Sequence, residues 1–109
     1  MRFLVTLISL VALNRATPKV PEPVRIDVKT FQFTPDTLRV SVGTTVQWVN
    51  QDEIEHTVTA GSATERDTSF NTTLAKKGAT AERKFERSGT FTYFCDRHQF
   101  MRGTITVTR

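Results

Sequence analysis

The sequence predicts an all-β fold, an antiparallel β-sandwich, on three observations. Short segments alternate apolar and polar residues, as where Val24, Ile26 and Val28 alternate with charged neighbours. Turn-forming residues such as Gly43 and Gly89 separate these segments at regular intervals. No segment keeps a helical period of apolar residues over several turns. Short alternating strands divided by turns are typical of sandwiches in which each strand buries one face.

The same criteria place the strands in order along the chain. In the strand before the cysteine, Phe91, Tyr93 and Cys95 share one face, and in the last strand Ile105 and Val107 point inward. Elsewhere the pattern is weaker, and the boundaries follow the turn residues. The expected strands cover residues 24–33, 38–42, 45–50, 56–60, 68–74, 79–86, 90–95 and 103–108.

The first 23 residues are predicted to lie outside the folded domain. Residues 1–16 resemble a secretory signal peptide, because Arg2 precedes a mostly apolar run that ends at Leu13, and Ala16 offers a small residue for cleavage. That run is too short for a membrane span, although an uncleaved anchor is the alternative. Residues 17–23 form a proline-rich linker. Residues 24–109 then form one domain, as a chain of 109 residues allows.

The charge of the chain argues against nucleic-acid binding. The formal net charge is +4, from 15 basic and 11 acidic residues, and two of the basic residues lie in the expected signal peptide. The remaining excess of positive charge is small and forms no basic stripe.

The single cysteine excludes an internal disulfide, and an exposed thiol in an exported protein would be oxidised. A thiolate bound to a metal would not have that liability.

Few residues of the chain can act as soft or imidazole ligands. Cys95 is the only cysteine, His56 and His98 are the only histidines, and Met101 is the only methionine besides Met1. Two imidazoles, one thiolate and one weak thioether are the ligands of a blue-copper electron-transfer site. Three of the four residues would lie on one tight loop between two strands, and His56 would come from a separate loop. The sequence therefore predicts a copper site at one end of the sandwich.

Each of these residues taken alone has a more ordinary explanation. A cysteine at a strand end is more often a small core residue, and a histidine or methionine in a loop is more often a rim or packing residue. Only their joint spacing favours a metal site. A structural zinc site is the chemical alternative, but zinc prefers a fourth hard or thiolate ligand to a thioether. The glycosylation acceptor Asn71-Thr72-Thr73 is interpreted as a chance match.

Two segments carry a family resemblance, NQDEIEHTV at 50–58 and GTFTYFCDRHQFMRG at 89–103, supported by FTP at 33–35 and GTTVQW at 43–48. The chain resembles the cupredoxins, in particular the plastocyanin and amicyanin group. The two-residue gap between His98 and Met101 is similar to that of amicyanin. The resemblance implies a Greek-key β-sandwich that carries one type 1 copper at one end, with the ligands proposed above.

The resemblance also implies roles for two neighbours of the ligands. Asn50 would bridge the two ligand loops by hydrogen bonds, one of them near the sulfur of Cys95, although a turn-forming role explains it equally well. Asp96 stands where this group usually has serine or threonine. Its carboxylate would add negative charge near the metal and favour Cu(II), so we expect the Asp96→Thr variant to have the higher reduction potential.

The sequence thus favours an exported, monomeric one-electron carrier that is not an enzyme, since two histidines cannot supply the further copper sites of a copper oxidase or nitrite reductase. Transient protein partners would dock near His98, on a rim that includes Gln99 and Phe100. Arg97 and Arg102 would steer an acidic partner, or serve only solubility. The alternative is a periplasmic copper-buffering or copper-delivery protein without a dedicated redox partner.

Overall fold

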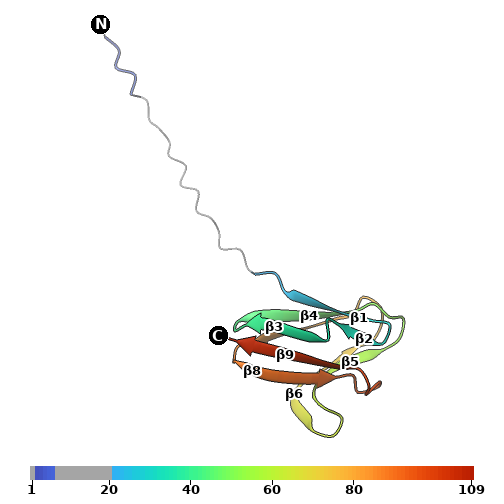
Figure 1. Cartoon of the computed structure of the whole chain (residues 1–109). Helices are drawn as coiled ribbons and strands as arrows, with labels where there is room; N and C mark the ends of the chain where they lie inside the picture. Colours follow the sequence, from blue (N-terminus) through green and yellow to red (C-terminus); the bar gives the residue numbers. More distant parts are fainter. Residues whose placement is uncertain (1, 7–20) are drawn as a thin grey trace.

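The computed structural model describes residues 2–6 and 21–109, and a β-sandwich is formed by residues 24–108. Two β-sheets face each other, as Figure 1 shows. Within the described ranges the chain forms no helix, and therefore none that is long and apolar enough to cross a membrane. The predicted all-β sandwich is confirmed.

The smaller sheet has four strands in the order β2-β1-β4-β7, and the larger has five in the order β3-β9-β8-β5-β6. The strands of the smaller sheet are β1 Val24–Lys29, β2 Gln32–Thr34, β4 Thr44–Asn50 and β7 Thr80–Phe85. Those of the larger sheet are β3 Thr37–Ser41, β5 His56–Gly61, β6 Arg66–Leu74, β8 Gly89–Phe94 and β9 Arg102–Thr108.

The strand pairing differs from the purely antiparallel arrangement that the sequence predicts. Strand β1 pairs with β4 in parallel, and β3 pairs with β9 in parallel, so both sheets are mixed. The other pairs are antiparallel. The chain changes sheets between β2 and β3, at Pro35 and Asp36, and such crossovers bring strands distant in sequence side by side, as in a Greek key. Alternation of apolar residues is the same in both kinds of pairing and cannot distinguish them.

The segment 24–33, expected as one strand, is a β-hairpin. Strands β1 and β2 pair around a two-residue turn formed by Thr30 and Phe31, whose φ angles are 54° and 57°. Left-handed backbone at both central positions defines a type I′ turn, which usually contains asparagine and glycine. Because neither residue occurs here, the sequence gives no local signal of this turn.

The core lies between the sheets and follows the predicted alternation. Ile26, Val46, Trp48 and Ile105 are all fully or almost fully buried. The polar side chains of Asn50 and His56 are also fully buried, at the end of β4 and the start of β5. Burial of polar groups is costly unless they are hydrogen-bonded or bind a metal, so this end of the core is a candidate site.

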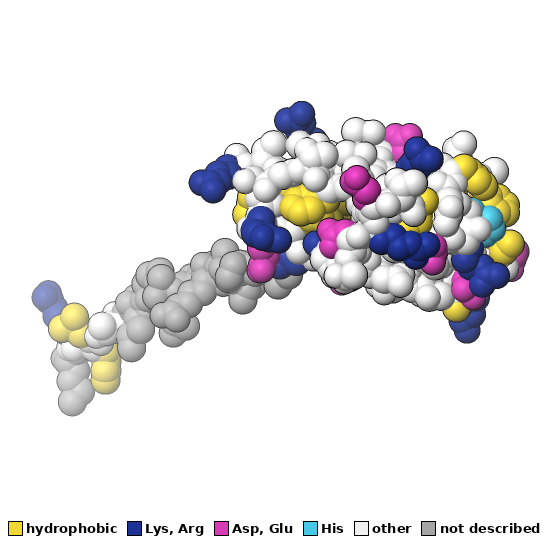
Figure 2. Space-filling model, turned by 90° about the horizontal axis from the view of Figure 1, so that it is seen from below, with side chains coloured by type: hydrophobic (Ala, Val, Ile, Leu, Met, Phe, Trp, Pro, Cys, Tyr) yellow, Lys and Arg dark blue, Asp and Glu magenta, His cyan; other side chains and the backbone are white. Residues whose placement is uncertain are grey.

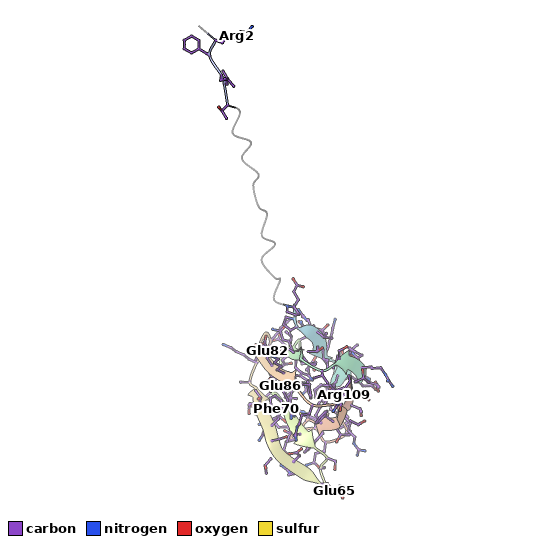
Figure 3. The ribbon with its side chains drawn as sticks, turned by 90° about the vertical axis from the view of Figure 1, so that its left-hand side faces the viewer. Arg2, Glu65, Phe70, Glu82, Glu86 and Arg109 are labelled. Atoms are coloured by element: carbon purple, nitrogen blue, oxygen red, sulfur yellow. The ribbon has the colours of Figure 1, made fainter. Side chains whose placement is uncertain are left out.

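The same end of the molecule holds several connections. Figure 1 shows the β1–β2 turn, the start of β5 and the β8–β9 loop together at one end, and the C-terminus at the other. The β5–β6 hairpin extends furthest from the sandwich, and Figure 3 shows Glu65 at its outer tip, away from Glu82 and Arg109. The predicted functional loop therefore lies at the end opposite the C-terminus.

The predicted signal peptide and linker lie largely outside the described residues, which omit 1 and 7–20. In the described segment 2–6 the side chains of Phe3, Leu4 and Val5 are exposed. The domain organisation expected for residues 1–23 thus stays a prediction.

Candidate metal centre

Three potential ligands meet at the end of the core described above. His56 is the first residue of β5, Cys95 follows β8 directly, and His98 lies in the loop that leads to β9. One donor atom from each residue lies within 4.8 Å of the others. The predicted convergence of these three residues is therefore observed, although they come from segments about 40 residues apart in the chain.

The distances between the donor atoms suit a metal in a trigonal arrangement. The Sγ atom of Cys95 lies 3.8 Å from Nδ1 of His56 and 3.7 Å from Nδ1 of His98. A metal about 2.0–2.1 Å from an imidazole nitrogen and about 2.3 Å from a thiolate, at about 120°, separates nitrogen and sulfur by roughly 3.8 Å. Both sulfur–nitrogen separations therefore match those expected when the three donors share one ion.

The site is enclosed on the side of the core and open on one edge. Cys95 and His56 are fully buried and His98 is half-buried. Figure 2 shows histidine surface at one end of the domain with hydrophobic side chains beside it. Since His56 has no exposed surface, this surface belongs to His98. Of the three clustered residues, His98 is therefore the one that reaches the surface.

Backbone hydrogen bonds close the ligand loop and bring Met101 back to it. The amide of Cys95 donates to the carbonyl of Met101 at 3.1 Å, and the amide of Met101 donates to the carbonyl of His98 at 2.9 Å. The side chain of Met101 is 2% exposed. The loop is therefore a compact turn closed by backbone hydrogen bonds at both of its ends. Met101 is thus buried at the end of the loop that carries Cys95 and His98.

Thr57 connects the two ligand-bearing segments. Its amide donates to the Cys95 sulfur at 3.3 Å, and its hydroxyl accepts a hydrogen bond from the amide of Asp96 at 2.8 Å. An N–H donor to a thiolate stabilises the negative charge on sulfur and so tunes a bound metal. Sequence reasoning missed this residue, although its position directly after His56 places it next to a ligand.

Asn50 does not make the bridge to the ligand loop that the resemblance implied. Its amide donates to the carbonyls of Ile54 at 2.9 Å and Leu74 at 3.2 Å, and its Oδ1 accepts from the amide of Asp52 at 2.9 Å. These bonds engage the side chain with the segment before His56 and with the end of β6. Asn50 therefore holds the backbone that leads to the ligand, and Thr57 makes the contacts expected of it.

Asp96 is paired with a cation. Its carboxylate accepts a hydrogen bond from Arg66, and this bond lowers the pKa of the Asp96 carboxyl. Both side chains are exposed, at 51% for Arg66 and 37% for Asp96. The negative charge anticipated near the metal is thus present, but a positive charge from the start of β6 accompanies it.

The two arginines of the expected docking surface differ in whether they form an ion pair. Arg97 pairs with Glu55 at 3.0 Å, whereas Arg102 donates only to the carbonyl of Gln99, at 3.5 Å, and forms no ion pair within residues 21–109. Phe100 is 69% exposed. The rim thus combines an exposed aromatic side chain with one arginine that forms no ion pair among residues 21–109.

Two further residues of this end were not predicted. The ring of Phe31, from the β1–β2 turn, packs edge-on against His56 and His98, with ring centroids 5.3 and 5.0 Å apart. The carboxylate of Asp52 lies 2.8 Å from Nε2 of His56. Burial raises the pKa of Asp52, but hydrogen bonds from the amides of Phe31 and Thr30 and from His56 outweigh it, so the pKa lies below its ordinary value.

Comparison with known proteins agrees with this geometry. Residues 22–108 match the model of the family described as copper binding proteins, plastocyanin/azurin family. The chain belongs to this family of copper-binding proteins, and copper is the metal for which the cluster of His56, Cys95 and His98 is suited. The resemblance to cupredoxins seen in the sequence is confirmed.

The chain is similar to an amicyanin, a plastocyanin and part of a larger copper-containing protein. Amicyanin from Paracoccus denitrificans is 29% identical over 82 residues, which are 75% of this chain and 63% of that protein, slightly under two thirds of its length. Plastocyanin from Scenedesmus fuscus is 34% identical over 83 residues, 69% of this chain and 85% of that protein. A copper-containing nitrite reductase from Thermus scotoductus is 28% identical, with a TM-score of 0.73 over 84% of this chain but only 23% of its own.

Proposed function

We propose that this protein is an exported type 1 copper protein that carries one electron at a time between redox partners. The ligands are His56, Cys95 and His98, with Met101 as the weak axial ligand. The observation that carries the proposal is the pair of separations between Cys95 Sγ and the two imidazole nitrogens, 3.8 and 3.7 Å, in a site closed to water on its inner side.

Copper supplies a one-electron Cu(I)/Cu(II) couple when bound by two imidazoles, a thiolate and a weak thioether. The chain contributes by keeping its donors in one arrangement for both oxidation states. His56 begins a strand, Cys95 follows one, and backbone bonds tie Met101 to the loop. Fixed donors keep the reorganisation that accompanies electron transfer small.

The electron would enter and leave through His98. This ligand is half-buried, and Gln99, Phe100, Arg97 and Arg102 form the docking surface around it. A small apolar patch with a polar rim suits the brief encounters of redox proteins. Because Arg102 forms no ion pair among the described residues, whereas Arg97 pairs with Glu55, Arg102 is the better candidate to attract an acidic partner. The protein would act as a monomer.

Export fits the chemistry of the thiol. Residues 1–16 would be the signal peptide and residues 17–23 the linker before the copper domain, which places the protein in the periplasm or another extracytoplasmic space. Cys95 is free but fully buried, which protects it from oxidation there. The mass of the mature protein, measured by mass spectrometry after expression in a bacterium with an export system, tests this. An uncleaved chain in the cytoplasm would contradict it.

Copper buffering or delivery remains the alternative, but the burial of the site disfavours it. Exchange of Cu(I) between proteins is served by exposed sulfur ligands, whereas here Cys95 is fully buried and Met101 is 2% exposed. Enzymatic activity is also disfavoured. The nitrite reductase that shares this fold is about four times longer than the matched part, and this chain has only two histidines.

The test is the visible spectrum of the protein with Cu(II). We expect an intense thiolate-to-copper band in the wild type, its loss in Cys95→Ala, and its retention with a changed reduction potential in Met101→Leu. The axial ligand tunes the potential, whereas the band needs the thiolate. A colourless wild type would refute the copper site, and an unaltered potential in Met101→Leu would remove Met101 from the ligand set.

A further inference from the structure

The Thr30–Phe31 turn has a conformation that its sequence does not favour. Both residues have positive φ, yet neither is glycine, asparagine or aspartate. A bulky aromatic residue in the left-handed region is a genuine outlier, and such residues cluster at functional sites when their surroundings hold them in place.

The turn is held by one carboxylate. Asp52 accepts a hydrogen bond from the amide of Thr30 on Oδ1, at 2.7 Å, and one from the amide of Phe31 on Oδ2, at 3.0 Å. Asp52 is 22 and 21 residues away in the chain, so these are tertiary contacts. Two successive amides that point at one anion form a small binding nest.

The same carboxylate also contacts His56, one of the proposed copper ligands. Oδ2 of Asp52 lies 2.8 Å from Nε2 of His56, the ring nitrogen that faces away from Cys95. The amide of Asp52 is in turn held by Oδ1 of the buried Asn50. A carboxylate on the far nitrogen of a ligating imidazole fixes its tautomer and orientation and increases its basicity.

The turn places an aromatic ring over the site. Phe31 meets His56 and His98 edge-on, at interplanar angles of 89° and 88°, and is 38% exposed. It also lies beside Phe100, with ring centroids 6.4 Å apart. Its position therefore covers the edge of both imidazoles and extends the apolar rim around His98.

From this arrangement, and given the proposed copper site, we propose that Asp52 is a positioning residue for the copper ligands. Its carboxylate holds His56 directly, and through the two turn amides it holds the Phe31 ring across both histidines. Asp52 thus joins the buried and the exposed side of the site. An asparagine cannot replace it, because a single amide oxygen cannot accept all three hydrogen bonds.

The test compares Asp52→Asn with Glu53→Gln, both loaded with copper. Glu53 is the adjacent residue and its side chain is 86% exposed, so its variant removes the same charge from a surface carboxylate that pairs with Lys77 at 3.5 Å. We expect Asp52→Asn to weaken Cu(II) binding by about 10–100-fold. If Cu(I) affinity changes little, even a tenfold loss raises the potential by about 59 mV. Glu53→Gln should give a much smaller shift. Equal shifts in the two variants would overturn the proposal.

Amide hydrogen exchange gives a second, independent measurement on the wild-type protein. The amides of Thr30 and Phe31 lie in an exposed turn, where exchange is ordinarily fast, and only the bonds to Asp52 protect them. We expect slow exchange at both in the metal-free wild type and in Glu53→Gln. Fast exchange in the wild type would overturn the proposal even if Asp52→Asn did not fold. A wild type without the thiolate band but with protected amides would instead refute the copper function alone.

Discussion

Gly103 is predicted to be irreplaceable because of the residue opposite it. Gly103 in β9 pairs with Tyr93 in β8 across the larger sheet. A Cβ atom at position 103 would lie 2.1 Å from Cζ and 2.2 Å from the hydroxyl oxygen of Tyr93. Carbon atoms in contact normally lie about 3.5–4.0 Å apart, so the ring would have to move by more than about 1 Å.

The tyrosine ring has little room to move. Tyr93 is 5% exposed, and the centroid of its ring lies 4.7 Å from that of Phe33 and 5.3 Å from that of Trp48. Overpacking of a dense core costs about 1–3 kcal/mol and occasionally more. Because the overlap here is severe and with a buried ring, we expect Gly103→Ala to lower the free energy of unfolding by about 2–4 kcal/mol.

Urea denaturation of the metal-free protein measures this effect, and a double-mutant cycle assigns it. Gly103→Ala should cost much less in a Tyr93→Leu background, where the ring is absent. Gly78→Ala is the control, because nothing lies within 4 Å of a Cβ there and its positive φ of 88° alone should cost about 1–2 kcal/mol. A Gly103→Ala variant within 0.5 kcal/mol of wild type, or a strictly additive cycle, would refute the reasoning.

Three further predictions concern charge. In voltammetry of the copper-loaded protein, Asp96→Thr should raise the potential and Arg66→Gln should lower it, because the two paired side chains carry opposite charges. Each shift should be smaller than that of Asp52→Asn, and shifts of the same sign would contradict this electrostatic effect. In stopped-flow reduction by an acidic redox protein at low salt, Arg102→Gln should slow the rate several-fold and Arg97→Gln less, since Glu55 already pairs with Arg97; equal effects would exclude this difference. Because the folded pKa of Asp52 is depressed, its contribution to stability is complete above its unfolded pKa of about 3.9 and is lost as pH falls through the folded value. The urea midpoint of the metal-free protein should therefore fall below about pH 4, less so in Asp52→Asn, and a flat midpoint from pH 5 to pH 2 would contradict this.

Most of the copper site could be predicted from the sequence because its ligands are rare residue types. With one cysteine and two histidines, there was a single way to combine His56, Cys95 and His98, and the structure brings them together. The inward-facing residues of the strands could also be predicted, because alternation reports burial directly. The core positions of Ile105 and Val107 confirm this.

Other features depend on contacts between distant segments and leave no local pattern. The turn at Phe31 interrupts a strand-like sequence because Asp52 binds its amides, and nothing within residues 24–33 indicates this. Gly103 lies in β9 without a positive φ, and only the ring of Tyr93 from the neighbouring strand explains why a glycine stands there. The hydrogen bonds between the two ligand segments, expected of Asn50, are made by Thr57. A family resemblance identifies the position of a residue in the sequence, but it does not identify the hydrogen-bond partners of its side chain.

The central claim is that one copper ion bound by His56, Cys95 and His98 carries one electron. The most direct measurement is a reductive titration of the Cu(II)-loaded protein, followed in its visible thiolate-to-copper band. We predict that the band saturates at one Cu(II) per chain, is bleached by one electron per chain, and returns fully on reoxidation. A band that is absent, or that does not return after one cycle of reduction and oxidation, would contradict the claim.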